Sequence, residues 1–347
     1  MPIMEKSKNI NTDSAKRELP KPIPAMGVDA YHKERELTLQ FDERKKDNYE
    51  LYLKSNRDKT VLDYLPIKLD IENVSRCNFR CTMCQVSDWK GGKRAEDFPF
   101  AAFKALLDQQ YGVVEIKIQG MGEPTLQGEE YFRMIRYARE RHIWVRTITN
   151  ASILHHKDYY RKLIGSDPNE VQISIDGATK EVFQGIRHNS RFDKVVNNCK
   201  LINQYCEDKK VRRTKMWTVV QKENIHQMKD LVYLAHEMGF KDMVFSLNLT
   251  DWGLSEWTDR NNIITVENVI DIEQCMNLVK LGNELGIYVS YWRVIDKYDS
   301  SNKDTLCPWP FERAYVSSDQ RVVPCCKLGN PDTFDLGSSK NFSYSWN

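Results

Sequence analysis

Hydrophobic and polar positions alternate in two rhythms along the middle of the chain. Short stretches with apolar residues at every second position, or apolar throughout, predict strands. These stretches cover 67–74, 113–119, 143–149, 171–175, about 215–220 and about 243–247. Longer stretches with apolar residues three and four positions apart predict helices between the strands. These cover 100–110, 128–141, 192–206, 225–238 and 264–285.

This order of elements predicts an α/β fold. Alternating strands and helices are typical of a parallel sheet with right-handed crossovers. Six strand–helix units are too few for a complete eight-fold barrel. We therefore expect an open, partial (β/α)6 barrel of the TIM type over residues 61–294, with its functional loops at the carboxyl ends of the strands.

The two ends of the chain break this rhythm. Residues 1 to about 27 are rich in Lys, Asn, Ser and Pro and show no periodicity, which predicts a disordered lead-in. Residues from about 32 to 56 mix dense charge with spaced apolar residues, which predicts an exposed helix, so we group 1–60 as one region. Residues 295–347 are punctuated by Cys, Pro and Gly and predict a small Cys-containing extension.

Charge and composition narrow the classes of function. The chain has 51 Lys and Arg against 49 Asp and Glu, so we expect it to bind neither nucleic acid nor an anionic membrane. No apolar run approaches the roughly 20 residues of a membrane helix, and the start of the chain lacks the apolar core of a signal peptide. We expect a cytoplasmic protein whose nine cysteines stay reduced.

Three cysteines, Cys77, Cys81 and Cys84, directly follow the first predicted strand. Iron–sulfur clusters usually take four cysteines, so three thiolates would leave one iron of a four-iron cluster open. An open metal position is where a ligand or substrate binds, as in catalytic zinc sites. A zinc site and three unrelated thiols are the alternatives. Zinc prefers four protein ligands, and the neighbouring loop offers no His and no fourth Cys, while three unrelated thiols within eight residues would be a coincidence.

This run, with the apolar Met83 just before its last cysteine, resembles the radical S-adenosylmethionine (radical SAM) superfamily. The resemblance implies a catalytic [4Fe–4S] cluster whose open iron binds the amine and carboxylate of SAM, with the residue at Met83 touching the adenine. It also implies that one electron cleaves the sulfonium and yields a 5′-deoxyadenosyl radical, which abstracts a hydrogen atom from the substrate. The protein then supplies binding, orientation and exclusion of side reactions.

A glycine-rich turn follows the second predicted strand. Gly120 and Gly122 can let the backbone approach a ligand, and the carboxylate of Glu123 can bind an ammonium group. A turn that only ends the strand would explain these residues equally well. With Pro124, the turn resembles the Gly-Gly-Glu-Pro element of the same superfamily, which implies that it binds the methionine amine of SAM.

Three further candidates lie near the ends of the later strands. Ser174 and Asp176 resemble a Ser-x-Asp-Gly element of the superfamily's peptide- and sugar-modifying branch, where the serine contacts SAM. Arg187 matches an arginine that pairs with the methionyl carboxylate. Asn150 resembles the second residue of a Thr-Asn pair, although a turn Asn is equally consistent. The loop 251–257 follows the sixth predicted strand at the same rim of the sheet. We expect it to face solvent, and contact of one of its residues with substrate is the alternative.

A second cysteine group lies near the end of the chain. The ordinary interpretations of Cys307, Cys325 and Cys326 are thiols packed in the core or ligands of a zinc ion. Their spacing resembles the extension called SPASM, or its shorter form called twitch, which implies an auxiliary [4Fe–4S] cluster. Gln320 stands where that pattern has Gly, and no cysteine follows Cys326, so we expect an incomplete extension.

The resemblance covers roughly residues 65–330 and implies an oxidoreductase. Its substrate would be a sugar, a cyclitol or a peptide, and a flavodoxin or ferredoxin would supply the electron. A redox-neutral epimerase, a non-catalytic iron–sulfur or zinc protein, and a scaffold acting through its N-terminal region remain alternatives. Three other cysteines are expected to be buried core thiols: Cys199, Cys206 and Cys275.

Overall fold

A computed structural model describes residues 18–55, 61–293 and 307–342. In this part of the chain, nine strands form one sheet in the order β11-β10-β1-β3-β4-β5-β7-β8-β9. The sheet is parallel except where β11 pairs with β10. Its strands are β1 (Lys68–Ile71), β3 (Glu115–Ile118), β4 (Trp144–Thr149), β5 (Glu170–Ser174), β7 (Thr214–Val219), β8 (Asp242–Ser246), β9 (Tyr288–Trp292), β10 (Arg313–Val316) and β11 (Val322–Val323).

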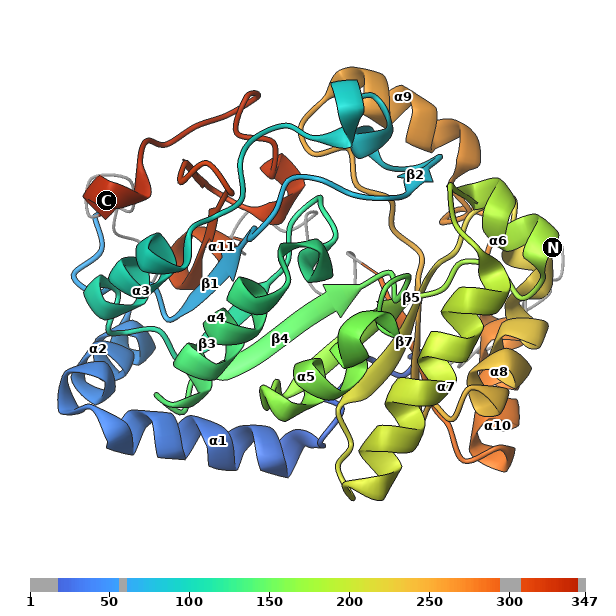
Figure 1. The fold of residues 1–347 in the computed structure, drawn as a ribbon, viewed down its shortest axis with the longest axis horizontal. Helices are drawn as coiled ribbons and strands as arrows, with labels where there is room; N and C mark the ends of the chain where they lie inside the picture. The colour runs from blue at the N-terminus through green and yellow to red at the C-terminus, as the bar shows by residue number, and fades with distance from the viewer. Residues whose placement is uncertain (1–17, 56–60, 294–306, 343–347) are drawn as a thin grey trace, which may run out of the picture.

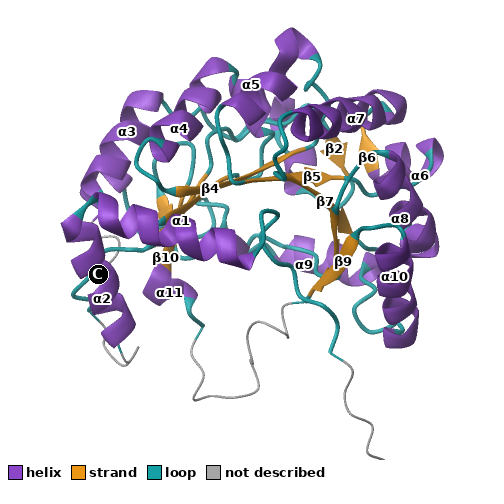
Figure 2. Ribbon diagram, turned by 90° about the horizontal axis from the view of Figure 1, so that it is seen from below, coloured by secondary structure: helices purple, strands orange, loops and turns teal. Residues whose placement is uncertain are grey.

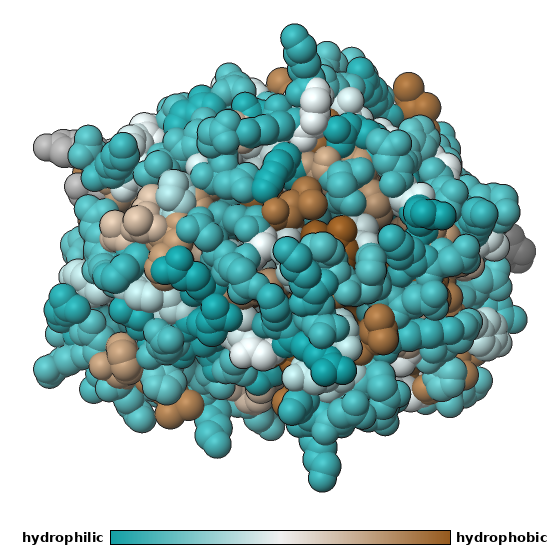
Figure 3. Space-filling model, viewed as in Figure 1, coloured by the Kyte–Doolittle hydropathy of each residue, from teal (hydrophilic) through white to brown (hydrophobic). Residues whose placement is uncertain are grey.

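Most of the helices cover the outside of the curved sheet (Figures 1 and 2). The helices are α1 (Val28–Phe41), α2 (Glu43–Lys54), α3 (Phe100–Gln109), α4 (Glu129–Arg139), α5 (Tyr159–Gly165), α6 (Lys180–Ile186), α7 (Phe192–Asp208), α8 (Met228–Glu237), α9 (Ser255–Ile264), α10 (Ile272–Glu284) and α11 (Trp309–Glu312). A separate two-stranded ladder joins β2 (Arg80–Cys81) to β6 (Arg187–His188). The face of the molecule in Figure 3 is largely hydrophilic, with small separate apolar groups.

All six predicted strands are present, and the α/β partial barrel is confirmed. Several elements were not predicted; among them, β9 extends the sheet at one edge, and β10 from the C-terminal extension lies parallel to β1. The helix predicted over 264–285 begins only at Ile272, while α9 occupies part of an expected loop. The single helix expected near 32–56 is two helices, because the Asp42 carboxylate accepts a hydrogen bond from Arg44 N and starts a new helix.

The two faces of the sheet differ in polarity. One set of alternating strand residues packs against the helices as the main core, including Leu69, Ile116, Val145, Ile173 and Met216. The other set forms the concave side, which we call the inner face. Toward the amino-terminal ends of the strands, the inner face carries charged and polar side chains: Lys68, Asp70, Glu115, Lys117, Arg146, Glu170, Lys215, Arg313 and Tyr315.

The segment 18–27 crosses the amino-terminal end of the inner face. Ala25 N donates to the Glu170 carboxylate at 2.8 Å, and Ile23 O accepts from Lys215 Nζ. Leu19 is buried in the core. The expectation of disorder up to residue 27 is therefore wrong for this described part, because its backbone satisfies buried charges of the sheet. Residues 1–17 lie outside the described residues.

Acid should destabilise the fold through two inner-face carboxylates. Burial alone would raise the pKa of Glu115 and of Glu170, but nearby cations, Arg146 first, outweigh it and hold each pKa at about 2. Both values lie below the ordinary 4.5, so this stabilisation is fully present above pH 4.5 and is lost as the pH falls towards 2. We expect the free energy of unfolding to fall by about 2 kcal/mol per carboxylate between pH 6 and pH 3.

Urea unfolding at several pH values checks this. Glu170→Gln should be less stable than wild type at pH 6 and should show a shallower pH dependence. A wild-type stability that stays level from pH 6 to pH 3 would exclude the electrostatic role of these carboxylates.

Candidate functional site

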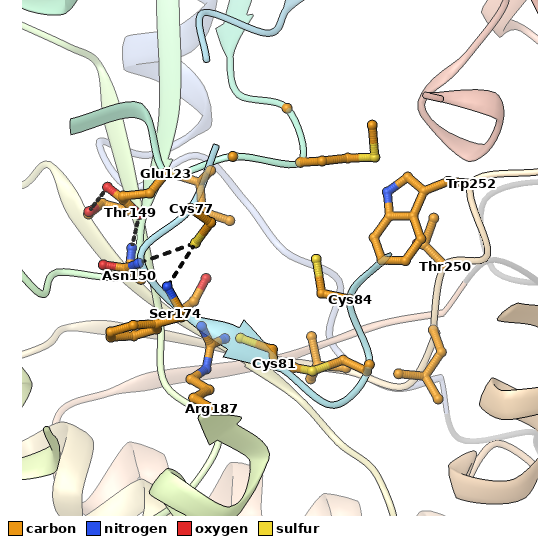
Figure 4. A pocket seen from close by; sticks show the side chains of 18 of the residues that line it. Cys77, Cys81, Cys84, Glu123, Thr149, Asn150, Ser174, Arg187, Thr250 and Trp252 are labelled. Carbon is orange, nitrogen blue, oxygen red and sulfur yellow. Dashed lines mark hydrogen bonds between the residues drawn. The ribbon is translucent and has the colours of Figure 1, made fainter. Parts of the chain in front are cut away.

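A cavity of about 230 Å³ lies at the carboxyl ends of the strands (Figure 4). It is the point where loops from β1, β3, β4, β5 and β8 meet, as expected for an active site on a parallel sheet. Ten of the residues singled out from the sequence line it: Cys77, Cys81, Met83, Cys84, Gly120, Gly122, Glu123, Asn150, Ser174 and Arg187.

The three cysteines lie on one loop that wraps the cavity. The loop is held in shape by hydrogen bonds from its side chains to its own carbonyls: Arg80 Nη1 donates to Cys77 O at 2.7 Å, and Ser87 Oγ donates to Cys81 O at 2.7 Å. Cys81 also pairs with Arg187 in the β2–β6 ladder, which brings the arginine to the cysteine loop.

Burial dominates the electrostatics of the three thiols. It raises the pKa of Cys77 to about 12 and raises the pKa values of Cys81 and Cys84 as well. Neutral thiols must therefore lose protons when they bind metal. Within the described ranges, no three Cys, His, Asp or Glu side chains are close enough to share one metal ion. Three thiols spread around one cavity suit a cluster, in which each sulfur binds a different iron, better than a single zinc ion.

The turn after β3 packs so closely against its neighbours that two of its positions have no room for a side chain. A Cβ atom at Gly120 would lie 2.2 Å from Glu72 Cγ, and one at Gly122 would lie 2.3 Å from the carbonyl oxygen of Val74. Neither position leaves room for a side chain, so the turn lies directly against the end of β1. This packing presents Glu123 to the cavity.

The Glu123 carboxylate is buried and surrounded by uncharged donors. Oε1 accepts from the hydroxyls of Thr125 and Thr149 at 2.5 and 2.7 Å and from Thr125 N at 3.2 Å, and Oε2 accepts from Asn150 N at 2.6 Å. Burial raises the pKa of Glu123, while these hydrogen bonds oppose the rise. Oε2 keeps a free lone pair, so this end of the cavity is suited to a cationic group such as an ammonium.

Arg187 supplies the opposite charge. Its Nε donates to Asp176 Oδ2 at 2.8 Å, its Nη2 forms an ion pair with the same oxygen at 2.6 Å, and Asp176 Oδ1 accepts from Val219 N. Within the described part of the chain, Nη1 has no protein partner, and Arg187 lines the cavity. Asp176 does not line the cavity, so its place in the structure is that of a buried counter-ion that orients Arg187.

The remaining sequence candidates divide into two groups. Asn150 lines the cavity and donates from Nδ2 to Asn78 Oδ1 at 3.0 Å, and Ser174 and Met83 face the same space. Pro124 lies behind the turn, where its carbonyl accepts from Asn73 Nδ2.

The C-terminal cysteines lie outside this cavity. Cys307 and Cys326 are exposed and Cys325 is partly buried. As described, they do not form a three-ligand metal group. The other three cysteines, Cys199, Cys206 and Cys275, are buried as expected.

The loop after β8 was misjudged from the sequence. Asn248, Thr250 and Trp252 line the cavity, and Trp252 lies across from Glu123 in Figure 4. Trp252 and Gly253 take left-handed φ angles of 52° and 86°, which turn the loop inward. The available signal was the place of this loop after a strand end, at the rim of the sheet where active sites of α/β proteins lie.

The C-terminal extension is joined to the site through Glu72 and Arg94. Glu72 Oε1 accepts from Met121 N in the glycine turn, and Oε2 accepts from Ser318 N of the extension. Arg94 binds both Glu72, at 3.0 Å, and Asp319, at 2.9 Å. The network therefore couples the position of the glycine turn to the packing of the extension.

The chain is similar to known proteins in sequence and in fold. A model of the Radical SAM superfamily matches residues 73–246. The mycofactocin maturase MftC of Mycolicibacterium smegmatis is 29% identical over 197 residues, which are 56% of this chain and 48% of MftC. The chain therefore spans about half the length of that relative.

Two solved structures share the fold. Streptococcus suis SuiB bound to its precursor peptide SuiA has a TM-score of 0.60 at 15% identity, over 82% of this chain and 65% of SuiB. The anSMEcpe protein with bound AdoMet has a TM-score of 0.57 at 20% identity, over 81% of this chain and 80% of that one. Among the helices that the structure describes, none combines the length and the apolarity needed to span a bilayer.

Proposed function

The chain belongs to the radical SAM superfamily, and on that premise we propose that it cleaves S-adenosylmethionine reductively and abstracts a hydrogen atom from a substrate. When bound, a [4Fe–4S] cluster and SAM supply a one-electron cleavage of the sulfonium that yields methionine and a 5′-deoxyadenosyl radical. The observation that carries the proposal is the shared cavity of Cys77, Cys81 and Cys84 with Glu123 and Arg187.

The side chains present fit these groups. Cys77, Cys81 and Cys84 would hold the cluster through three thiolates. Glu123, a buried carboxylate with a free lone pair, would bind the methionine ammonium, and Arg187 would pair with the methionine carboxylate through Nη1. Two oppositely charged groups fix the orientation of a zwitterion, which places the rest of SAM along the cavity.

Other cavity residues would complete cofactor binding. Met83 would contact the adenine, while Asn150 and Ser174 would hydrogen-bond the remaining polar groups of SAM; Gly120 and Gly122 provide the turn that presents Glu123. Trp252, on the far side, would help to exclude water.

We infer that the substrate is a peptide. Two of the similar proteins support this choice over a sugar or cyclitol, because SuiB was solved with a precursor peptide and MftC is a maturase. We also propose an auxiliary cluster on Cys307, Cys325 and Cys326, which would accept an electron and make the overall reaction an oxidation. A flavodoxin or ferredoxin would supply the first electron.

Anaerobic reconstitution followed by iron and sulfide analysis tests this assignment. The wild-type protein should form 5′-deoxyadenosine when reduced with SAM. A Cys77, Cys81, Cys84→Ala triple variant should lose that activity and keep only iron bound by the extension. Iron retained in this variant supports the auxiliary cluster, and its absence removes the basis for an oxidation.

Replacing Glu123 with glutamine should weaken SAM binding at least about tenfold. The change keeps the shape of the side chain but removes the charge that would face the ammonium, and charge-assisted hydrogen bonds contribute about 1.5–3 kcal/mol. Anaerobic equilibrium dialysis of SAM with the reconstituted protein measures the effect. The exposed Glu237 on α8 is a control, and Glu237→Gln should bind like wild type. Equal affinity in Glu123→Gln would remove Glu123 from the SAM site.

A further inference from the structure

One cation of the inner face lies just below the cofactor cavity. Lys117 is on β3, in register with Asp70 on one side and Arg146 on the other. It comes three residues before Gly120, which lines the cavity. Two strand residues span about 7 Å, so the lysine lies about that far below the level of Gln119 and Ile148.

The neighbouring charges of the inner face are already paired. Asp70 binds Arg313 at 3.1 Å, and Arg146 lies 3.1 Å from Glu170. Lys68 lies 3.3 Å from Glu312. Each of these side chains therefore has its charge balanced within the protein.

Lys117 is different from them. Among the charged side chains of the inner face that the structure describes, it alone has neither an ion pair nor a hydrogen bond. The residue as a whole is partly exposed, and it does not line the cofactor cavity itself. Burial lowers its pKa, and the charge of Asp70 opposes this change.

Two uncharged groups beside Lys117 also lack partners. Gln119 Oε1 and the Tyr315 hydroxyl are buried and make no hydrogen bond. Tyr315 is in register with Asp70, which is in register with Lys117, so the three residues occupy adjacent strands. Neighbouring strands lie about 4.8 Å apart, which places Lys117 and Tyr315 about 10 Å apart at their Cα atoms, within reach of one small group.

We propose that Lys117, with the Tyr315 hydroxyl, binds a carboxylate of the substrate, while Gln119 Oε1 accepts a hydrogen bond from an adjacent N–H. The proposal rests on the proposed function, because it places the carboxylate a few bonds from the carbon that loses hydrogen beside SAM. The substrate is then an acidic amino-acid residue or a chain-terminal carboxylate.

Short probes test the subsite in the reconstituted protein with SAM bound. The first pair is N-acetyl-alanyl-aspartyl-alanine amide and its asparaginyl equivalent, which differ in one charge. The second pair is an acetylated alanine tripeptide with a free or an amidated C-terminus. Succinate represents a free small acid. Saturation-transfer NMR titration gives a Kd for each, and we expect at least one carboxylate probe to bind about tenfold tighter than its neutral partner.

Variants connect this preference to Lys117. Lys117→Met should abolish it and Lys117→Arg should keep most of it. Lys68→Met removes a paired cation from the adjacent strand and should leave the preference intact. Lys117→Met should also raise the Tm by a few degrees, because an unpaired, partly buried charge is unfavourable in the fold. A merely structural lysine would instead lower the Tm when replaced.

The outcomes separate the two proposals. A preference carried by the aspartyl, free-terminus or succinate probe identifies the source of the carboxylate. No preference in wild type, or a preference that survives Lys117→Met, overturns the subsite. Formation of 5′-deoxyadenosine by the same wild-type preparation shows whether the proposed radical SAM function stands independently of that result.

Discussion

Replacing Cys81 with alanine should abolish 5′-deoxyadenosine formation and remove the iron of the catalytic cluster. The thiol lies in the middle of the three-cysteine loop and lines the cavity. With two thiolates left, a four-iron cluster has too few protein ligands to remain bound. Because SAM cleavage requires that cluster, the variant should lose all of its activity. Iron analysis of the anaerobically reconstituted variant, and chromatography of its products after reduction with SAM, measure it.

A buried cysteine elsewhere provides the control. Cys199 lies on α7 in the core and does not line the candidate site, so Cys199→Ala should keep its iron and its products. If Cys81→Ala also retained both, the cysteine loop would not hold the cluster and the proposed chemistry would have no site.

Replacing Arg94 with methionine should destabilise the protein by about 3–5 kcal/mol. The variant leaves Glu72, which is fully buried, without its counter-ion, and breaking a buried ion pair by removing one partner has a cost of this size. It also releases Asp319 and so loosens the C-terminal extension. Urea unfolding gives the free energy, and limited proteolysis reports whether the extension is cut first.

The exposed pair of Lys200 and Glu237 gives the comparison for this variant. Surface ion pairs contribute at most about 1 kcal/mol, so Lys200→Met should be close to wild type. Similar stabilities for Arg94→Met and Lys200→Met would show that the Glu72 network does not tie the extension to the barrel.

Much of the fold was accessible from the sequence because its strands are short apolar or alternating stretches, and the first of them alternates. Leu69 and Ile71 pack outward against helices while Lys68 and Asp70 face the inner side, so the period of two survives in a parallel sheet. Parallel strands covered on both faces usually read as continuous apolar runs. The alternation of polar and apolar residues therefore also indicates that the inner face of the sheet is polar.

What the sequence could not supply was long-range pairing. The strand β10 lies beside β1, more than 240 residues earlier, and no local pattern encodes that contact. The inward turn of the Trp252 loop depends on two left-handed residues, and the packing requirement of Gly120 depends on the distant Glu72. The cysteine run, by contrast, is a local signal, so its place at the strand ends could be predicted.

The most direct test of the central claim is the electron paramagnetic resonance spectrum of the reduced, reconstituted protein before and after addition of SAM. The account predicts a four-iron cluster signal that depends on Cys77, Cys81 and Cys84 and that changes when SAM binds its open iron. A signal that is unaffected by saturating SAM, with no 5′-deoxyadenosine formed, would contradict it.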